Sequence, residues 1–374
     1  MKVLYISNYQ EASGYSTAAR DYILALDSVG VDVVPRRLHI TGSEHPVPEK
    51  ILELEKKSDK KPNVIIQHSL PHAFHWTPKA KCVGMFAWET SDFNGSSWSR
   101  YLNQMDEVWV FNRQMVQACQ RSHVTKPIRV IPHAVDTFKF QKSYPKLELP
   151  SKDFLFYFIG ESIKRKNLPA FVQAFHTEFD PREPVSIVIK TNVPGMSPSD
   201  GYNFIAGKCN EIKHGIKKFW SIDKYKPEMI ITDNMSEDKM NALHRSCNCL
   251  VAPSYGEAWC LPALDAMGHG NPVIVSDNTG FKDYVDNGCG ILVKCREVPV
   301  FGMVQSLQDL YTSDETWWEP DILDLQVAMR GMYEDSAVRK QMGLKGLNKA
   351  FQFSHQAVGR KMKKALEELC STSQ

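Results

Sequence analysis

Short apolar runs, mostly of β-branched and aromatic residues, recur along the chain and alternate with helical patterns. Runs this continuous in apolar residues are typical of parallel strands buried on both faces of a sheet. In the first half they predict strands at KVLYIS (2–7), VDVVP (31–35), NVIIQH (63–68), CVGMFA (82–87), EVWVFN (107–112) and IRVIPH (128–133). In the second half they predict strands at FLFYFIG (154–160), VSIVIKT (185–191), EMIITD (228–233), NCLVAPS (248–254), PVIVSD (272–277) and GILVK (290–294).

Between these runs the apolar residues follow the helical period. In STAARDYILALDSVG (16–30), Ser16 is the predicted N-cap, and Gly30 lies just past the predicted helix end. Alternating strands and helices build βαβ units. The predicted fold class is therefore α/β, with two Rossmann-like, doubly wound parallel-sheet domains that face a central cleft. Because such sheets bind ligands at the carboxyl ends of their strands, we expect the active site in that cleft.

The segment FQKSYPKLELPSKD (140–153) is rich in Pro, Lys and Ser and has no strand or helix periodicity, which predicts a linker. We predict an N-terminal Rossmann-like domain over 1–145 and a C-terminal one over 146–355. A C-terminal helix over 356–374 is expected to pack back on the N-terminal domain. After Cys295 the pattern predicts helices almost throughout, and we expect the pair Trp317-Trp318 to anchor one of them.

Composition is that of a folded protein of two domains, with 374 residues and 43% hydrophobic residues. The net charge of +2 does not favour a nucleic-acid partner, although EKKSDKK (55–61) and KHGIKKFW (213–220) leave local phosphate contacts possible. Nine scattered cysteines without a C-x-x-C pair fit reduced thiols in a cytoplasmic protein. No apolar run reaches the roughly 20 residues of a membrane span, so we expect no transmembrane segment.

The stretch YGEAWCLPALDAMGHGNPVIVSDNTG (255–280) follows a predicted strand and carries two carboxylates, Glu257 and Asp265. Pro262 suits the first turn of a helix, and we expect Asp265 in that turn, where the helix dipole stabilises a carboxylate by about 0.3–1 kcal/mol. The backbone N–H groups of the preceding residues would bind an anion. A diphosphate with hydroxyl groups on both sides, as in a nucleotide-sugar, would satisfy all of these groups. The alternative is a solvated loop carboxylate and an ordinary helix-start aspartate.

PSYGEAWCLPALDAMGHGNPVIVSDNTG (253–280) resembles the signature of the family four retaining glycosyltransferases, P-S-x-x-E-G-F-G-L-P-x-x-E-A-M-A-x-G-x-P-V-I. Three further segments resemble this family in the family's order: SGYSTAAR (13–20), VIPHAVDTFKF (130–140) and FIGESIKRKNLPAFVQAF (158–175). The resemblance covers residues 1–360. It implies the GT-B fold, with an acceptor-side first domain and a nucleotide-sugar-binding second domain. It also implies transfer of a sugar from a UDP- or GDP-linked donor to a hydroxyl-bearing acceptor, with retention of configuration.

The resemblance assigns a role to each matching residue. Glu257 would accept hydrogen bonds from the donor sugar, and Asp265 from the ribose hydroxyls. The other donor-binding candidates are Gly14, Gly160, Arg165, Lys166, Trp259, Cys260 and Leu261. The catalytic candidates are Glu257, Glu89 and Lys166, and the acceptor-side candidates are Tyr15, His68 and His133. Because no D-x-D motif occurs, and Lys, Arg and helix N-termini can supply the counter-charges, we expect neither a metal nor a cofactor.

The sequence departs from the family pattern at several positions. Asp265 stands where Glu is usual, Ala258-Trp259-Cys260 replaces Gly-Phe-Gly, Glu161 replaces an Arg and His133 replaces an Asn. Two alternatives stay open. One is a glycosyltransferase directed at DNA bases or another polyanion, and the other is a catalytically inactive nucleotide-sugar-binding protein.

Overall fold

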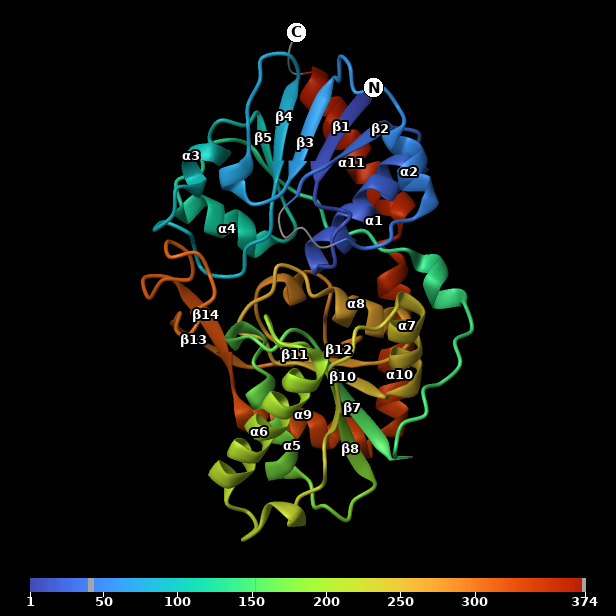
Figure 1. Ribbon diagram of the computed structural model, residues 1–374, viewed down its shortest axis with the longest axis vertical. Coiled ribbons are helices and arrows are strands. Elements are labelled where there is room, and N and C mark those ends of the chain that lie inside the picture. Colours follow the sequence, from blue (N-terminus) through green and yellow to red (C-terminus); the bar gives the residue numbers. More distant parts are fainter. Residues whose placement is uncertain (40–43, 152, 372–374) are drawn as a thin grey trace. The chain divides into compact units, whose positions relative to one another are not determined.

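The computed structural model describes residues 1–39, 44–151 and 153–371 (Figure 1). The chain divides into two compact units. Unit 1 comprises Met1–Thr137, Ser306–Thr316 and Phe351–Gln374, and unit 2 comprises Phe138–Gln305 and Trp317–Ala350. Lys152 of the predicted linker and residues 372–374 of the predicted terminal helix lie outside the described residues. The domain limits at 145 and 355 stay predictions.

Unit 1 contains a six-stranded parallel sheet in the order β2-β1-β3-β4-β5-β6. All strands predicted for the first half of the chain are present: β1 Lys2–Ser7, β2 Asp32–Arg37, β3 Val64–His68, β4 Lys81–Met85, β5 Glu107–Val110 and β6 Ile128–Val130. The helices between them are α1 Gly14–Ser28, α2 Glu49–Glu55, η1 Pro71–Ala73, α3 Trp98–Leu102 and α4 Arg113–Arg121. A 3-10 helix, η2 Thr137–Gln141, follows β6. The strand order reverses between β1 and β3.

Helix α1 begins before the predicted N-cap. Ser13 is the cap, because its extended backbone lets its hydroxyl accept a hydrogen bond from the N–H of Ser16 at 3.1 Å. Ser16 therefore lies inside the first turn, and the prediction that it caps the helix was wrong. Gly30 follows the helix end with φ +75, a left-handed conformation that favours glycine.

Helix α11 (His355–Ser371) packs on α1, and Figure 1 shows the red α11 beside the blue N-terminal elements. The contact is close because Gly359 lies against the backbone of α1. A Cβ atom at Gly359 would lie 2.2 Å from the carbonyl oxygen of Ala25. At one end of this contact His355 pairs with Asp21 at 2.7 Å, and at the other Lys363 donates to the carbonyl of Val29 at 3.2 Å. The C-terminal helix is thus part of unit 1.

Unit 2 contains a second six-stranded parallel sheet, in the order β12-β11-β10-β7-β8-β9. The strands predicted for the second half are again present: β7 Phe154–Ile159, β8 Val185–Lys190, β9 Met229–Ile231, β10 Cys249–Ala252, β11 Val273–Ser276 and β12 Gly290–Val293. The helices are η3 Lys164–Lys166, α5 Leu168–Glu178, α6 Pro198–Ile216, η4 Ile222–Lys224, α7 Glu237–Ser246, α8 Leu261–Gly268, η5 Thr279–Asp283, α9 Ile322–Glu334 and α10 Ser336–Phe351. The strand order reverses between β7 and β10. Side chains of β7, β8, α5, α6 and α9 form a continuous apolar core.

The part of the chain after Cys295 is not almost wholly helical, so that prediction was wrong. Two short strands, β13 Cys295–Pro299 and β14 Thr316–Pro320, form a two-stranded sheet before α9 begins. Trp317 and Trp318 belong to β14, and the Trp317 ring stacks on Tyr255, with ring centroids 4.5 Å apart. Aromatic residues favour strands, and the TWWEP sequence carries that propensity.

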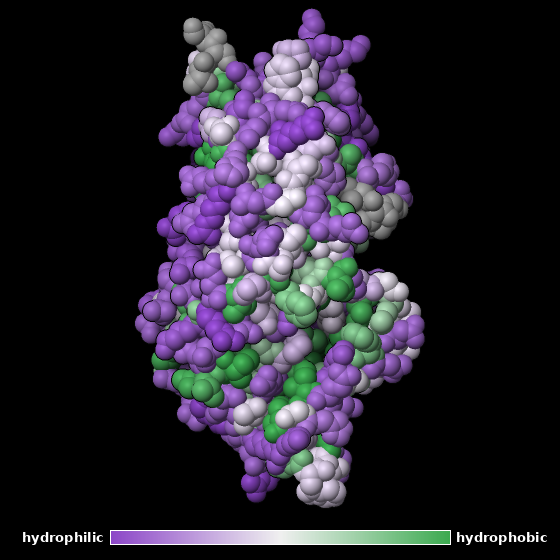
Figure 2. All heavy atoms as spheres, turned by 90° about the vertical axis from the view of Figure 1, so that its left-hand side faces the viewer, coloured by the Kyte–Doolittle hydropathy of each residue, from purple (hydrophilic) through white to green (hydrophobic). Residues whose placement is uncertain are grey.

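The surface is mostly hydrophilic on the face drawn in Figure 2, where apolar side chains form separate patches. Among the described helices, none combines the length and the apolar composition needed to cross a membrane. All nine cysteines are free thiols.

The substitution Gly359→Ala is expected to lower the free energy of unfolding by about 2 kcal/mol, because the added methyl group overlaps a backbone carbonyl. Urea denaturation followed by circular dichroism measures the change. Gly207→Ala in α6 is the matched control, since no atom lies within 4 Å of that Cβ position. The control should gain about 0.5–1 kcal/mol, as alanine does in a helix. Equal unfolding curves for the two variants would contradict the close approach of α11 to α1.

Candidate functional site

Glu257 lies at the carboxyl end of the unit 2 sheet, in the loop between β10 and α8. The strand order reverses between β7 and β10, and ligands of doubly wound sheets bind outside such a reversal. Gly160 directly follows β7, and η3 brings Arg165 and Lys166 back to the same edge. Residues that follow two neighbouring strands therefore meet at the place where this fold binds ligands.

The Glu257 carboxylate is buried, with 3% of the residue exposed, and it is paired with cations. Lys166 Nζ lies 2.7 Å from Oε1 and 2.9 Å from Oε2, and Arg165 donates to Oε2 at 3.1 Å. The Ser254 hydroxyl donates to Oε1 at 2.7 Å. Burial alone would raise the pKa of Glu257, but Lys166 and Arg165 outweigh it, so the pKa is lowered and the carboxylate is ionised at neutral pH. Glu257 is thus not a solvated loop carboxylate.

Residues of the DNTG segment (277–280) hold the Glu257 loop, and the sequence analysis assigned them no role. The N–H of Glu257 donates to the Thr279 hydroxyl at 2.8 Å, and the N–H of Gly280 donates to the Glu257 carbonyl at 2.9 Å. A Cβ atom at Gly280 would lie 2.4 Å from the carbonyl oxygen of Ala258. Asn278 donates to the carbonyl of Ser254 at 3.0 Å. In the sequence, the cluster of Asn, Thr and Gly after β11 was the feature from which this contact with the Glu257 loop could have been predicted.

Asp265 does not lie in the first turn of α8, which was a wrong prediction. The helix begins at Leu261, with Pro262 inside its first turn as expected, so Asp265 falls in the second turn. There its carboxylate pairs with Lys139 of η2 at 2.7 Å, and the Lys139 side chain is 11% exposed. The charge of Asp265 is therefore balanced by a lysine that is remote in the sequence. The helix dipole stabilises the Asp265 carboxylate less than predicted, because Asp265 lies beyond the first turn.

The residues Ala258-Trp259-Cys260 lead into α8 in a constrained conformation. The Trp259 ring stacks on Tyr284 with centroids 4.8 Å apart, and the Tyr284 hydroxyl donates to the Trp259 carbonyl at 2.7 Å. Cys260 caps the helix with φ +69. This is the left-handed region, where residues other than glycine are strained. The family pattern has Gly at this position, and the geometry gives the physical reason for it.

In unit 1 the structure brings Tyr15, His68 and Glu89 to the carboxyl end of the sheet. Tyr15 follows β1 at the start of α1, His68 ends β3, and Glu89 follows β4. The rings of Tyr15 and His68 lie 4.9 Å apart, and the Tyr15 hydroxyl accepts from the N–H of Ala87 at 2.8 Å. Burial raises the pKa of Tyr15, and the nearby charge of Glu89 adds to the effect. Tyr15 and His68 flank the reversal of strand order between β1 and β3, and Glu89 follows the next strand, β4.

His68 and His133 of unit 1 are buried and neutral at physiological pH. Burial lowers the pKa of His68 to about 3, and it lowers the pKa of His133 well below the ordinary value. His133 stacks on Tyr22 with centroids 5.4 Å apart, and Tyr22 in turn lies 5.7 Å from His68. His68 and His133 therefore belong to one aromatic cluster. Gly14 is exposed, and no protein atom lies within 4 Å of its Cβ position.

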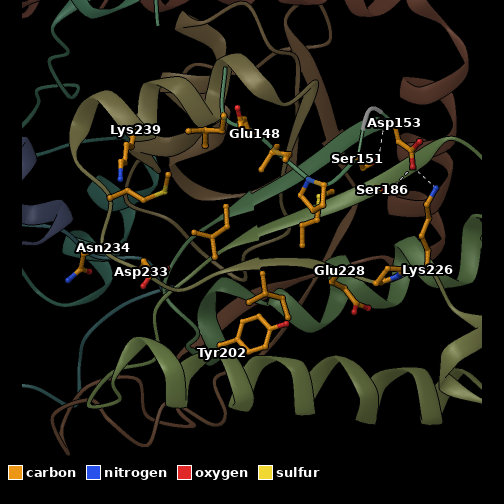
Figure 3. Close-up of a pocket in the computed structure, with 18 residues that line it drawn as sticks. Glu148, Ser151, Asp153, Ser186, Tyr202, Lys226, Glu228, Asp233, Asn234 and Lys239 are labelled. Atoms are coloured by element: carbon orange, nitrogen blue, oxygen red, sulfur yellow. Dashed lines mark hydrogen bonds and ion pairs between the residues drawn. The ribbon is translucent and has the colours of Figure 1, made fainter. Parts of the chain in front are cut away.

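A cavity of about 730 Å³ lies along β9, the edge strand of the unit 2 sheet (Figure 3). None of the site residues predicted from sequence lines it. Three of its polar side chains pair with one another: Lys226 lies 2.6 Å from Asp153, and Ser186 donates to Asp153 at 2.8 Å. The cavity follows the strand edge rather than the reversal between β7 and β10, so we take the Glu257 cluster as the candidate site of unit 2.

A family comparison decides what kind of domain carries the Glu257 cluster. Residues 139–302 match the family model described as glycosyl transferases group 1, and this range includes Arg165, Lys166, Glu257 and Asp265. The chain carries a group 1 glycosyltransferase domain. The Lys139–Asp265 and Lys166–Glu257 pairs both lie within this domain. No curated protein sequence matches the chain.

Solved structures show that the whole chain has the GT-B fold of such enzymes. Sucrose-phosphate synthase from Thermosynechococcus elongatus is similar over 100% of both chains, with TM-score 0.67 and 18% identity. HepE of Anabaena, solved in complex with UDP-glucose, is similar over 98% of this chain and 100% of its own, with TM-score 0.65 and 12% identity. A glycosyltransferase from Rickettsia africae gives TM-score 0.65 and 13% identity over 100% of this chain and 99% of its own. The α/β fold of two parallel sheets predicted from the sequence is confirmed.

The group 1 domain offers a direct test of the strain at Cys260. Cys260→Gly is expected to be more stable than Cys260→Ala by about 1 kcal/mol, because only glycine adopts the left-handed conformation without strain. Both variants lose the thiol, so the difference between them measures the cost of the left-handed backbone conformation at residue 260. The urea midpoints of the two variants measure the difference. If Cys260→Ala is as stable as Cys260→Gly, residue 260 is not strained.

Proposed function

We propose that this protein is a retaining glycosyltransferase that moves a sugar from a nucleotide-diphosphate sugar to a hydroxyl acceptor. The observation that carries the proposal is the pairing of Lys166 and Arg165 with the buried Glu257, at the strand reversal of the group 1 domain. Two cations and a carboxylate at one point suit a ligand that carries a diphosphate next to a hydroxylated sugar.

Charge balance explains how the donor would enter this cluster. The Lys166 and Arg165 side chains are 18% and 12% exposed, so an anion can reach them from solvent. Donor phosphates would compete with Glu257 for these cations. Glu257 would then turn its acceptor oxygens to the hydroxyls of the sugar. The backbone from Trp259 to Leu261 would hold the diphosphate at the start of α8.

Asp265 would accept hydrogen bonds from the ribose hydroxyls. Lys139 Nζ lies 2.7 Å from Asp265 Oδ1. This ion pair would fix the orientation of the Asp265 carboxylate and so the direction of its remaining lone pairs. The side chain is 23% exposed and can be reached by a ligand. The UDP-glucose complex of the similar HepE protein supports a uridine donor. UDP- and GDP-linked sugars are the two donor classes that we propose.

In the transfer step the bond between the anomeric carbon and the leaving diphosphate breaks. The acceptor oxygen bonds to the same carbon on the same face, and its proton passes to the leaving phosphate. Lys166, Arg165 and the start of α8 would stabilise the departing charge. Glu89 would orient the acceptor hydroxyl. Tyr15 and His68, which lie beside Glu89 at the same sheet edge, are the acceptor-side residues that we propose.

We propose that the reaction needs no metal ion. The counter-charges for the diphosphate would come from Lys166 and Arg165 instead. Addition of EDTA is expected to leave donor binding unchanged.

Lys166→Met is expected to weaken the binding of UDP or GDP, whichever the wild type binds, by at least about tenfold, because it removes one charge-assisted contact. Isothermal titration with UDP, GDP, UDP-glucose and GDP-mannose measures it. Lys208→Met is the matched control, since Lys208 lies on the exposed face of α6 and pairs only at the surface with Glu211, at 2.8 Å. Equal affinities for the wild type and Lys166→Met would overturn the donor site.

A further inference from the structure

The segment Ser306–Thr316 leaves β13, packs within unit 1 and returns to β14. It binds the loop Trp88–Asn94 that follows β4. The N–H of Ser91 donates to the carbonyl of Thr316 at 2.9 Å, and the N–H of Thr316 donates to the Ser91 hydroxyl at 2.9 Å. These paired hydrogen bonds fix the two segments in register, although they lie far apart in the sequence.

A buried carboxyl group makes a second contact between the two segments. Glu315 is 1% exposed, and its Oε2 lies 2.6 Å from the Thr90 hydroxyl, which also lies 2.8 Å from the carbonyl of Asp92. The Thr90 hydroxyl donates to Glu315 Oε2, and the N–H of Thr312 donates to Glu315 Oε1 at 3.1 Å, so both carboxyl oxygens are hydrogen-bonded. Burial raises the pKa of Glu315 to about 7, and these hydrogen bonds oppose that rise.

Tyr311 makes the third contact, and it reaches Glu89. Its ring packs on the Trp88 indole with centroids 4.7 Å apart, and its hydroxyl donates to Glu89 Oε2 at 2.7 Å. Tyr311 has φ +57, a left-handed conformation that is uncommon for an aromatic residue. The surrounding contacts hold this conformation, and it carries the hydroxyl to the Glu89 carboxylate.

We propose that Tyr311 is a positioning residue that holds the Glu89 carboxylate in the orientation needed to bind the acceptor hydroxyl. The inference rests on the proposed function, in which Glu89 orients the acceptor. A carboxylate on a loop loses side-chain entropy when it is fixed, and a hydrogen bond from a rigid phenol selects one orientation in advance. Tyr15 lies at the same sheet edge, where burial and the charge of Glu89 raise its pKa. In this role Tyr311 acts on the acceptor through Glu89, with which its hydroxyl is hydrogen-bonded.

The test is the release of UDP from UDP-glucose or of GDP from GDP-mannose, with water as the acceptor. Tyr311→Phe keeps the ring and removes the hydroxyl. It is expected to lower kcat about tenfold and to leave KM for the donor within about twofold, since the donor is bound by other residues. Glu89→Gln should lower kcat further, and the double variant should equal Glu89→Gln alone. Tyr202→Phe on α6, where the side chain is largely exposed, is the matched control and should match the wild type.

Each outcome decides one claim. If Glu89→Gln is impaired and Tyr311→Phe has wild-type kcat, the positioning role is overturned while the proposed function stands. If Glu89→Gln has wild-type kcat, the role of Glu89 and the inference both fail. A multiplicative loss in the double variant would also contradict the inference, because Tyr311 would then act independently of Glu89. Hydrogen exchange of residues 86–95 does not depend on turnover: unchanged protection in Tyr311→Phe would show that Tyr311 does not fix this loop.

Discussion

The buried carboxylate of Glu257 is the constraint on which the unit 2 site depends. An ionised carboxylate at 3% exposure is stable only when it is paired and hydrogen-bonded. Lys166, Arg165 and Ser254 meet that requirement, so the loops after β7 and β10 must come together at the strand reversal. In the proposed function, Lys166 and Arg165 would already be ordered when a diphosphate arrives, which would lower the entropy cost of binding.

The loop that carries the candidate residue Glu89 in unit 1 is held by a segment that is remote in sequence. Tyr311 and Glu315 hold the loop that carries Glu89, and both come from the stretch between β13 and β14. The strand reversal between β1 and β3 brings Tyr15 and His68 to the same edge. In both units, polar residues follow strands at or next to a reversal of strand order, and segments remote in sequence contact them.

The strands and the α/β class could be predicted from the sequence, because long apolar runs are decided by burial alone. Glu257, Arg165 and Lys166 could be grouped from their motif, and the structure brings them into contact. The Lys139–Asp265 pair, the strands β13 and β14, and the contact of Tyr311 with Glu89 could not be predicted. Each depends on packing between distant segments. The cysteine at position 260 gives no sign of a left-handed backbone by itself, whereas the Gly of the family pattern at that position is the residue that this conformation favours.

The central claim is that Lys166, Arg165 and the start of α8 bind the diphosphate of a nucleotide-sugar. A crystal structure of the protein soaked with UDP tests it most directly. The account predicts phosphate density within hydrogen-bond distance of Lys166 Nζ and the backbone at residues 259–261, with the ribose hydroxyls on Asp265. UDP bound elsewhere, for example in the cavity along β9, with the Lys166–Glu257 pair undisturbed, would contradict it.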